Sequence, residues 1–139
     1  MEDIYIKKIK SNINPNRDDI SVRILNNEKT LEEYKKTVQT FMAQGNYMEA
    51  INTYKQMYML TKDNLYRIYI ADIVLKGFNN PRKSLELYKQ LEPYMGNDLN
   101  FLYGISDVYF VLNDYYNQVL YLSKALNIQK GGEKCLNFQ

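Results

Sequence analysis

The sequence predicts an all-α fold, a solenoid of three helix-turn-helix units preceded by an extra N-terminal helix. From Leu31 onward the chain divides without a gap into three blocks of 34 residues, 31–64, 65–98 and 99–132, and each block opens with Leu. Within each block two segments carry apolar residues at helical spacing. A fixed period of this length is typical of repeat proteins, in which each unit buries its apolar side against the next.

The composition fits one folded domain without a nucleic-acid or membrane signature. The 139 residues can bury a sizeable core. Lys and Arg number 18 against 16 Asp and Glu, so the basic face expected of a nucleic-acid-binding protein is missing. The opening residues MEDIYIKKIK are charged and no apolar run follows them. We therefore expect no signal peptide and no membrane insertion, and a cytoplasmic protein.

Residue types needed for common catalytic sites are scarce. Histidine is absent and Cys135 is the single cysteine, which excludes an intrachain disulfide, the usual zinc-ligand sets and nucleophile–histidine pairs. The best catalytic material is Asp72 and Asp107 with Lys76, because two carboxylates can act as a pair when their pKa values are split. Scattered charges are more often a solvated surface. We expect no enzyme activity, no catalytic residue, no cofactor and no metal.

The first block shows the two-helix pattern most clearly. Val38 and Phe41 lie on one side of a first helix, and Ala50, Tyr54 and Met57 lie on one side of a second. The turns between the paired helices read AQGN, GFNN and VLND in the three blocks. Each block therefore predicts two antiparallel helices joined by a short polar turn.

Helix caps recur in register with the blocks. The sixteenth position of the three blocks holds Asn46, Asn80 and Asp114. These residue types can accept an unpaired N–H at a helix N-terminus. Glu49, three residues after Asn46, completes a capping box, and so does Glu33 after Thr30. Pro81 stands at the first helical position, where its missing N–H costs nothing.

The two ends do not follow the period. In 1–30 we expect a short helix near Asp19–Asn27, which would cover the first unit or serve as a dimerisation element. Residues 133–139 form a tail in which Leu136 and Phe138 could begin a further helix. The last helix then keeps an apolar flank, which self-association, a partner or a longer natural chain would cover.

The repeating unit resembles that of the tetratricopeptide repeat family over Leu31–Gly132. In the first block Gly45, Tyr47, Ala50 and Tyr54 stand at the small, aromatic and packing positions of the family. The resemblance implies a right-handed superhelical solenoid of three repeats. It also implies protein binding in a concave groove lined by the first helix of each pair.

The later blocks depart from the family pattern. In the second block Asn79 replaces the turn glycine, and Pro93 predicts an early end to the helix because it removes an interior N–H donor. In the third block Gln118 stands where Ala50 and Ser84 are small in the others. We therefore expect looser packing of the last helix pair.

The resemblance assigns the groove residues. The candidate partner-binding positions are Lys35, Gln39, Tyr66, Tyr69, Ile73, Lys76, Tyr103, Asp107 and Phe110. Its aromatic members give large contact area at a small entropy cost, so they are the expected anchors. The charged members would set polarity and register. The expected partner is another protein or peptide segment with apolar anchors.

The groove does not match the subset of the family that grips acidic C-terminal tails. Lys35 matches one position of that carboxylate clamp, but Gln39, Ile70, Asn100 and Gly104 replace the others. Three repeats, an extra N-terminal helix and an apolar aromatic groove are instead similar to the class II chaperones of type III secretion. Those chaperones hold an extended segment of a membrane-inserting translocator.

Two functions remain open on the sequence. The first is a non-catalytic adaptor or chaperone-like module that binds a partner segment in its groove. The second is a structural or oligomerisation subunit whose groove is filled by a second copy or by its own N-terminal segment. Ile4, Tyr5, Ile6 and Ile9 would supply that self-ligand.

Overall fold

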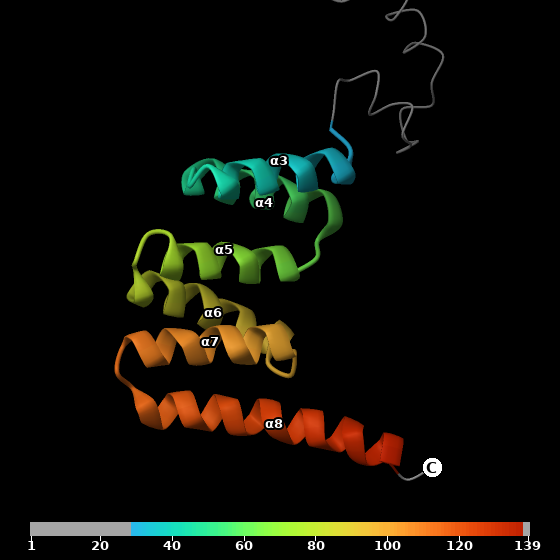
Figure 1. Cartoon of the computed structure of the whole chain (residues 1–139), viewed down its shortest axis with the longest axis vertical. Coiled ribbons are helices and arrows are strands. Elements are labelled where there is room, and N and C mark those ends of the chain that lie inside the picture. The colour runs from blue at the N-terminus through green and yellow to red at the C-terminus, as the bar shows by residue number, and fades with distance from the viewer. Residues whose placement is uncertain (1–28, 138–139) are drawn as a thin grey trace, which may run out of the picture.

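A computed structural model describes residues 29–137 as a stack of six α-helices (Figure 1). The helices are α3 (Leu31–Ala43), α4 (Tyr47–Thr61), α5 (Leu65–Lys76), α6 (Pro81–Met95), α7 (Leu99–Val111) and α8 (Tyr115–Asn137). Residues 29–137 contain no strand, which confirms the all-α class for this part of the chain. The predicted helix over Asp19–Asn27 lies outside these residues.

The helices begin at regular intervals along the chain. The first residues of α3, α5 and α7 are Leu31, Leu65 and Leu99, and those of α4, α6 and α8 are Tyr47, Pro81 and Tyr115. Every second helix thus begins 34 residues after its counterpart. Each helix packs on the next one along the chain, and α5 also contacts α7. Helix α5 is therefore the central element, packed against α4, α6 and α7.

The same turn joins the two helices of each pair. Gly45, Asn79 and Asn113 have φ angles of 70°, 50° and 61°, the left-handed region that glycine and asparagine enter most easily. The next backbone N–H then donates to a carbonyl in the last turn of the preceding helix, as Asp114 does to Tyr109 at 2.9 Å. Asparagine therefore replaces the turn glycine without changing the geometry of the turn.

Most of the predicted caps form. Thr30, Asn80 and Asp114 accept the backbone N–H groups of Glu33, Lys83 and Asn117 at 3.3, 3.2 and 3.2 Å. The capping box at Asn46 and Glu49 is wrong, because the Asn46 side chain makes no cap hydrogen bond. That side chain is exposed, so water can hydrogen-bond its amide and the first N–H groups of α4.

Two predicted helix ends are also wrong. Helix α6 does not end before Pro93 but continues to Met95. Near a helix end proline removes one hydrogen bond and leaves little helix beyond it to disturb. Helix α8 passes through Gly131 and Gly132 to Asn137, so no separate helix begins in the described part of the predicted tail, 133–137. Glycine lowers helix propensity by about 1 kcal/mol relative to alanine, which weakens a helix without ending it.

The predicted loose packing of the last helix pair is wrong as well. Among residues 29–137, α7 and α8 share the most extensive interface of any two helices. Gln118 is only half-buried and does not hold them apart. The contact is made by Ala125, which is fully buried, and by Tyr121, whose ring stacks on Tyr109 with centroids 5.6 Å apart.

Helix α5 contributes to two apolar clusters at once. Ile70 and Ile73 join the cluster formed with α3 and α4, while Ile68, Ala71 and Leu75 join the one formed with α6, α7 and α8. The helix is therefore packed on two sides, and the strips between them are left at the surface. Tyr69 and Lys76 lie on those strips.

Candidate functional site

The candidate residues lie on three alternate helices. Lys35 and Gln39 are one turn apart on α3, and the other positions recur every three or four residues on α5 and α7. Each helix therefore presents its share on one face. Eight of the nine residues fall into three groups: a cleft between α3 and α5, an ion-pair cluster between α5 and α7, and two aromatic side chains on α7. The ninth, Ile73, is buried.

The cleft has a volume of about 300 Å³. One wall is formed by Lys35 and Gln39 of α3, and the other by Tyr66 and Tyr69 of α5. Helix α4 lies between α3 and α5 and contacts both helices, and its side chains form the floor of the cleft. Residues that the family resemblance assigns to the groove thus lie on both walls of this cleft.

Three tyrosines form the aromatic part of the cleft. The ring of Tyr54 on α4 lies 6.1 Å from that of Tyr66 and 5.3 Å from that of Tyr69, measured between centroids. Tyr66 and Tyr69 meet edge to face at 6.2 Å. Burial, together with the neighbouring Tyr69 and Tyr66, raises the pKa of Tyr54. The Tyr54 hydroxyl therefore stays protonated and can donate a hydrogen bond to a bound group.

Exposure separates contact residues from supporting ones. Tyr69 is 38% exposed, whereas Tyr66 is 9% exposed and Ile73 4%. Tyr66 and Ile73 thus offer little surface to a partner. The ring of Tyr66 supports that of Tyr69, and Ile73 belongs to the apolar cluster formed with α3 and α4. Of the predicted α5 residues, Tyr69 and Lys76 reach solvent.

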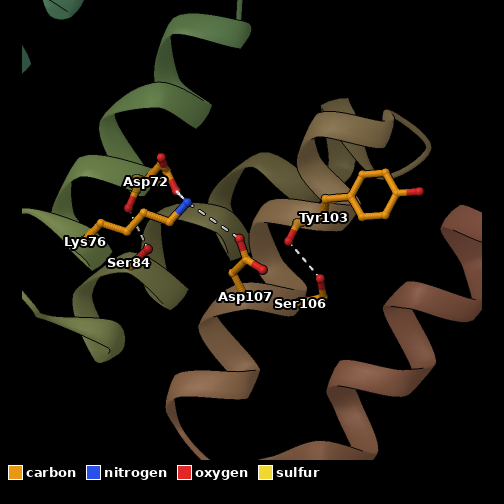
Figure 2. Close-up of polar contacts among 7 residues, drawn as sticks. Asp72, Lys76, Ser84, Tyr103, Ser106 and Asp107 are labelled. Atoms are coloured by element: carbon orange, nitrogen blue, oxygen red, sulfur yellow. Dashed lines mark hydrogen bonds and ion pairs between the residues drawn. The ribbon is translucent and has the colours of Figure 1, made fainter.

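Lys76 links α5 to α7. Its Nζ lies 3.0 Å from Asp72 Oδ1 on the same helix and 3.7 Å from Asp107 Oδ2 on α7, as Figure 2 shows. The hydrogen bond to Asp72 outweighs partial burial and, with the charge of Asp107, raises the pKa of Lys76. All three side chains are exposed, so each pair contributes no more than about 1 kcal/mol to stability.

The two aromatic candidates on α7 are directed toward α8. The Tyr103 hydroxyl donates to Gln129 Oε1 at 2.8 Å, and Figure 2 shows its ring pointing away from Lys76 and Asp107. Phe110, which is exposed, packs against Tyr115 at the start of α8 with ring centroids 6.2 Å apart. Neither ring lines the cleft between α3 and α5.

Four residues that line the cleft were not predicted: Val38 and Leu65 lie on first helices, and the other two lie on the second helix of a pair. Tyr54 and Met57 line the cleft from α4. The sequence placed both at packing positions, and groove positions were sought on first helices alone. The available signal was the tyrosine at a packing position. Its hydroxyl needs a polar neighbour or water, so it is expected to reach the edge of the packed region.

Neither a metal site nor a membrane-spanning helix is found among the described residues. No group of three His, Cys, Asp or Glu side chains among them is placed to hold a metal ion. None of the helices in this part of the chain is both long and apolar enough to span a membrane.

No protein-family model matches the chain, and no curated protein matches its sequence.

Proposed function

We propose that this chain is a non-catalytic adaptor or chaperone-like protein that binds a segment of another protein. Its three helix pairs would form a tetratricopeptide-like solenoid, with the binding surface on α3, α5 and α7. The observation that carries the proposal is the cleft between α3 and α5, where an exposed aromatic ring stands opposite polar side chains. The 34-residue spacing of the helix starts supports the repeat architecture.

The size and lining of the cleft favour a peptide over a small metabolite. Its volume of about 300 Å³ is at the low end for a ligand pocket, enough for one or two side chains. The Tyr69 ring can pack on an apolar anchor while the Tyr54 hydroxyl donates to the peptide backbone. Lys35 and Gln39, on the opposite wall, can hold polar groups of the same segment.

The carboxylates offer little support for catalysis. Lys76 lies between Asp72 and Asp107, so each acid faces a cation and not the other acid. The catalytic interpretation needs two carboxylates that act as a pair, and here a lysine side chain lies between them. The cluster instead serves to fix α5 against α7 next to the cleft.

The decisive experiment is capture of a partner from native lysate, identified by mass spectrometry. The full-length wild type is compared with a Tyr69→Ala, Tyr103→Ala double variant and with Tyr94→Ala, a control at an exposed tyrosine of α6. We expect one or more proteins to be retained by wild type and control and lost by the double variant. Equal retention by all three would reject the surface. A translocator-like membrane-inserting protein among the partners would favour the narrower chaperone function.

A structural or oligomerisation subunit is the second candidate, because α8 presents an apolar side. Tyr116, Val119, Leu120 and Leu126 are all exposed on it. A second copy could cover this surface by a contact of α8 with α8. Analytical ultracentrifugation of wild type and Val119→Glu, with Asn52→Glu on α4 as an exposed control away from α8, tests this function. A monomer at all concentrations would exclude it.

A further inference from the structure

A second groove lies on another face of α5, between α4 and α6. It consists of two adjoining hollows of about 410 and 510 Å³ that share Lys55, Ile70 and Leu87. Helix α4 supplies one wall and α6 the other, while Ile70 and Val74 of α5 form the floor. The groove has no residue in common with the cleft between α3 and α5.

The groove is long, and several large apolar side chains of its lining are exposed. It runs along α4 from Met48 to Met59, a distance of about 16 Å at the helical rise per residue. Met48 and Met59 are 55% and 65% exposed, and Phe78 is exposed at the same end as Met48. Flexible methionines rimming an apolar floor are typical of surfaces that accept the apolar face of a helix. The length fits about three turns of such a helix.

The charged side chains that line the groove are all basic. Its charged lining residues are Lys55, Arg67 and Lys83, and no carboxylate lines it among the residues described. The Arg67 guanidinium lies over the Tyr58 ring, 5.6 Å from its centroid, which keeps this charge at the groove edge. Lys83 lies 3.3 Å from Glu86, whereas no carboxylate of the described residues lies within ion-pair distance of Lys55.

We infer that this groove binds an amphipathic helix of another protein, with an apolar stripe on the floor and acidic residues toward Lys55, Arg67 and Lys83. Charge complementarity is the reason for choosing this occupant. The exposed helix of a second copy, α8, carries three lysines against one glutamate and would meet cations with cations. Residues 1–28 carry five acidic and five basic side chains and so have no acidic excess.

The test uses a synthetic, fluorescein-labelled peptide of about 12 residues, with leucine along one helical face and glutamate elsewhere. A matched peptide carries lysine in place of every glutamate. Fluorescence anisotropy measures binding to the full-length chain. Methyl-labelled methionine reports the place of binding by NMR, because Met48 and Met59 line this groove whereas Met42 lies on α3.

We expect the glutamate peptide to bind saturably, with shifts of the Met48 and Met59 methyl signals and an unchanged Met42 signal. A Lys55→Glu, Lys83→Glu variant should weaken this binding about tenfold and strengthen binding of the lysine peptide. The control Lys124→Glu on α8, also exposed, should change neither. The expected result is the same whether or not a partner also binds in the cleft between α3 and α5.

Four outcomes would overturn the inference. The first is the absence of saturable binding, and the second is equal affinity of wild type and the charge-reversed variant. The third is a shift of Met42 alone, which would place the peptide on the α3 side. The fourth is a change of the Met48 and Met59 signals in peptide-free protein, either on dilution or in an Ile20→Asp, Ile24→Asp variant. It would show that a second copy or residues 1–28 already occupy the groove.

Discussion

The ring of Tyr88 on α6 lies directly against Gly104 on α7. A Cβ atom at position 104 would approach the Tyr88 hydroxyl and lie 2.7 Å from ring atom Cζ, closer than real Cβ contacts come. Tyr88 is fully buried within the cluster that joins α5, α6, α7 and α8. The glycine therefore lets the tyrosine ring fill the space between α6 and α7.

Gly104→Ala should destabilise the protein by about 2 kcal/mol, because the added methyl overpacks a rigid buried site. Chemical denaturation followed by circular dichroism measures the change. The matched control is Gly131→Ala on α8, where a Cβ meets no atom within 4 Å. This control should be neutral or stabilising by up to about 1 kcal/mol, because alanine favours helix. Equal effects of the two substitutions would show that Tyr88 does not press on position 104.

Tyr88→Phe should stabilise the protein by about 1 kcal/mol. The Tyr88 hydroxyl is buried and has no hydrogen-bond partner among the described residues, so its desolvation is uncompensated. Burial, with the charges of Asp72 and Asp107, raises its pKa, so the group stays neutral. The same denaturation assay measures the gain. A loss of stability would mean that a water or another partner satisfies this hydroxyl in solution.

Local signals explain why much of the fold could be predicted. Helix starts follow from caps such as Asn80 followed by Pro81, and the turns follow from residues that tolerate a positive φ, such as Gly45 and Asn113. Both depend on a few neighbouring residues and therefore survive in any folded context. The end of α6 after Pro93 was missed, because one lost donor can be tolerated when packing holds the helix.

The candidate site was less predictable because exposure depends on spacing between helices. Tyr66 and Tyr69 have the same side chain, so the sequence does not distinguish them. In the structure only Tyr69 remains exposed where α4 packs on α5. Tyr103 is on the expected helix, but its ring is directed to α8 by Gln129, which is 26 residues away. Sequence periodicity selects a face of a helix and does not say which neighbour covers it.

Tyr121→Phe should have the opposite effect to Tyr88→Phe. The Tyr121 hydroxyl donates to Glu92 Oε2 at 2.7 Å and accepts from Lys89 Nζ at 2.9 Å, which ties α8 to α6. Phenylalanine keeps the stacking on Tyr109 and removes both hydrogen bonds. We expect a loss of about 1 kcal/mol in the free energy of unfolding. Stability equal to wild type would show that water replaces both bonds at no cost.

The same contacts should make stability sensitive to acid. Partial burial alone would raise the pKa of Glu92, but hydrogen bonds from Tyr121 and Lys89 outweigh it and hold that pKa below its usual value. A lowered pKa in the folded state gives stability that is present above the unfolded value and lost as the pH falls through the folded one. Denaturation midpoints from pH 7 down to about pH 3 should therefore fall more steeply in wild type than in Glu92→Gln. Parallel pH curves would contradict this contribution.

Substitutions at Tyr69 and Tyr103 should have unequal effects on the affinity for the proposed partner segment. Tyr69 belongs to the cleft, so Tyr69→Ala should weaken a micromolar complex by about 1 to 2 kcal/mol, measured by calorimetry with a peptide from the captured partner. The Tyr103 hydroxyl is already bonded to Gln129, so Tyr103→Phe should bind as wild type does. Circular dichroism confirms that the variants are folded. If Tyr103→Phe weakened binding and Tyr69→Ala did not, the partner would lie between α7 and α8, and the cleft between α3 and α5 would no longer be the binding site.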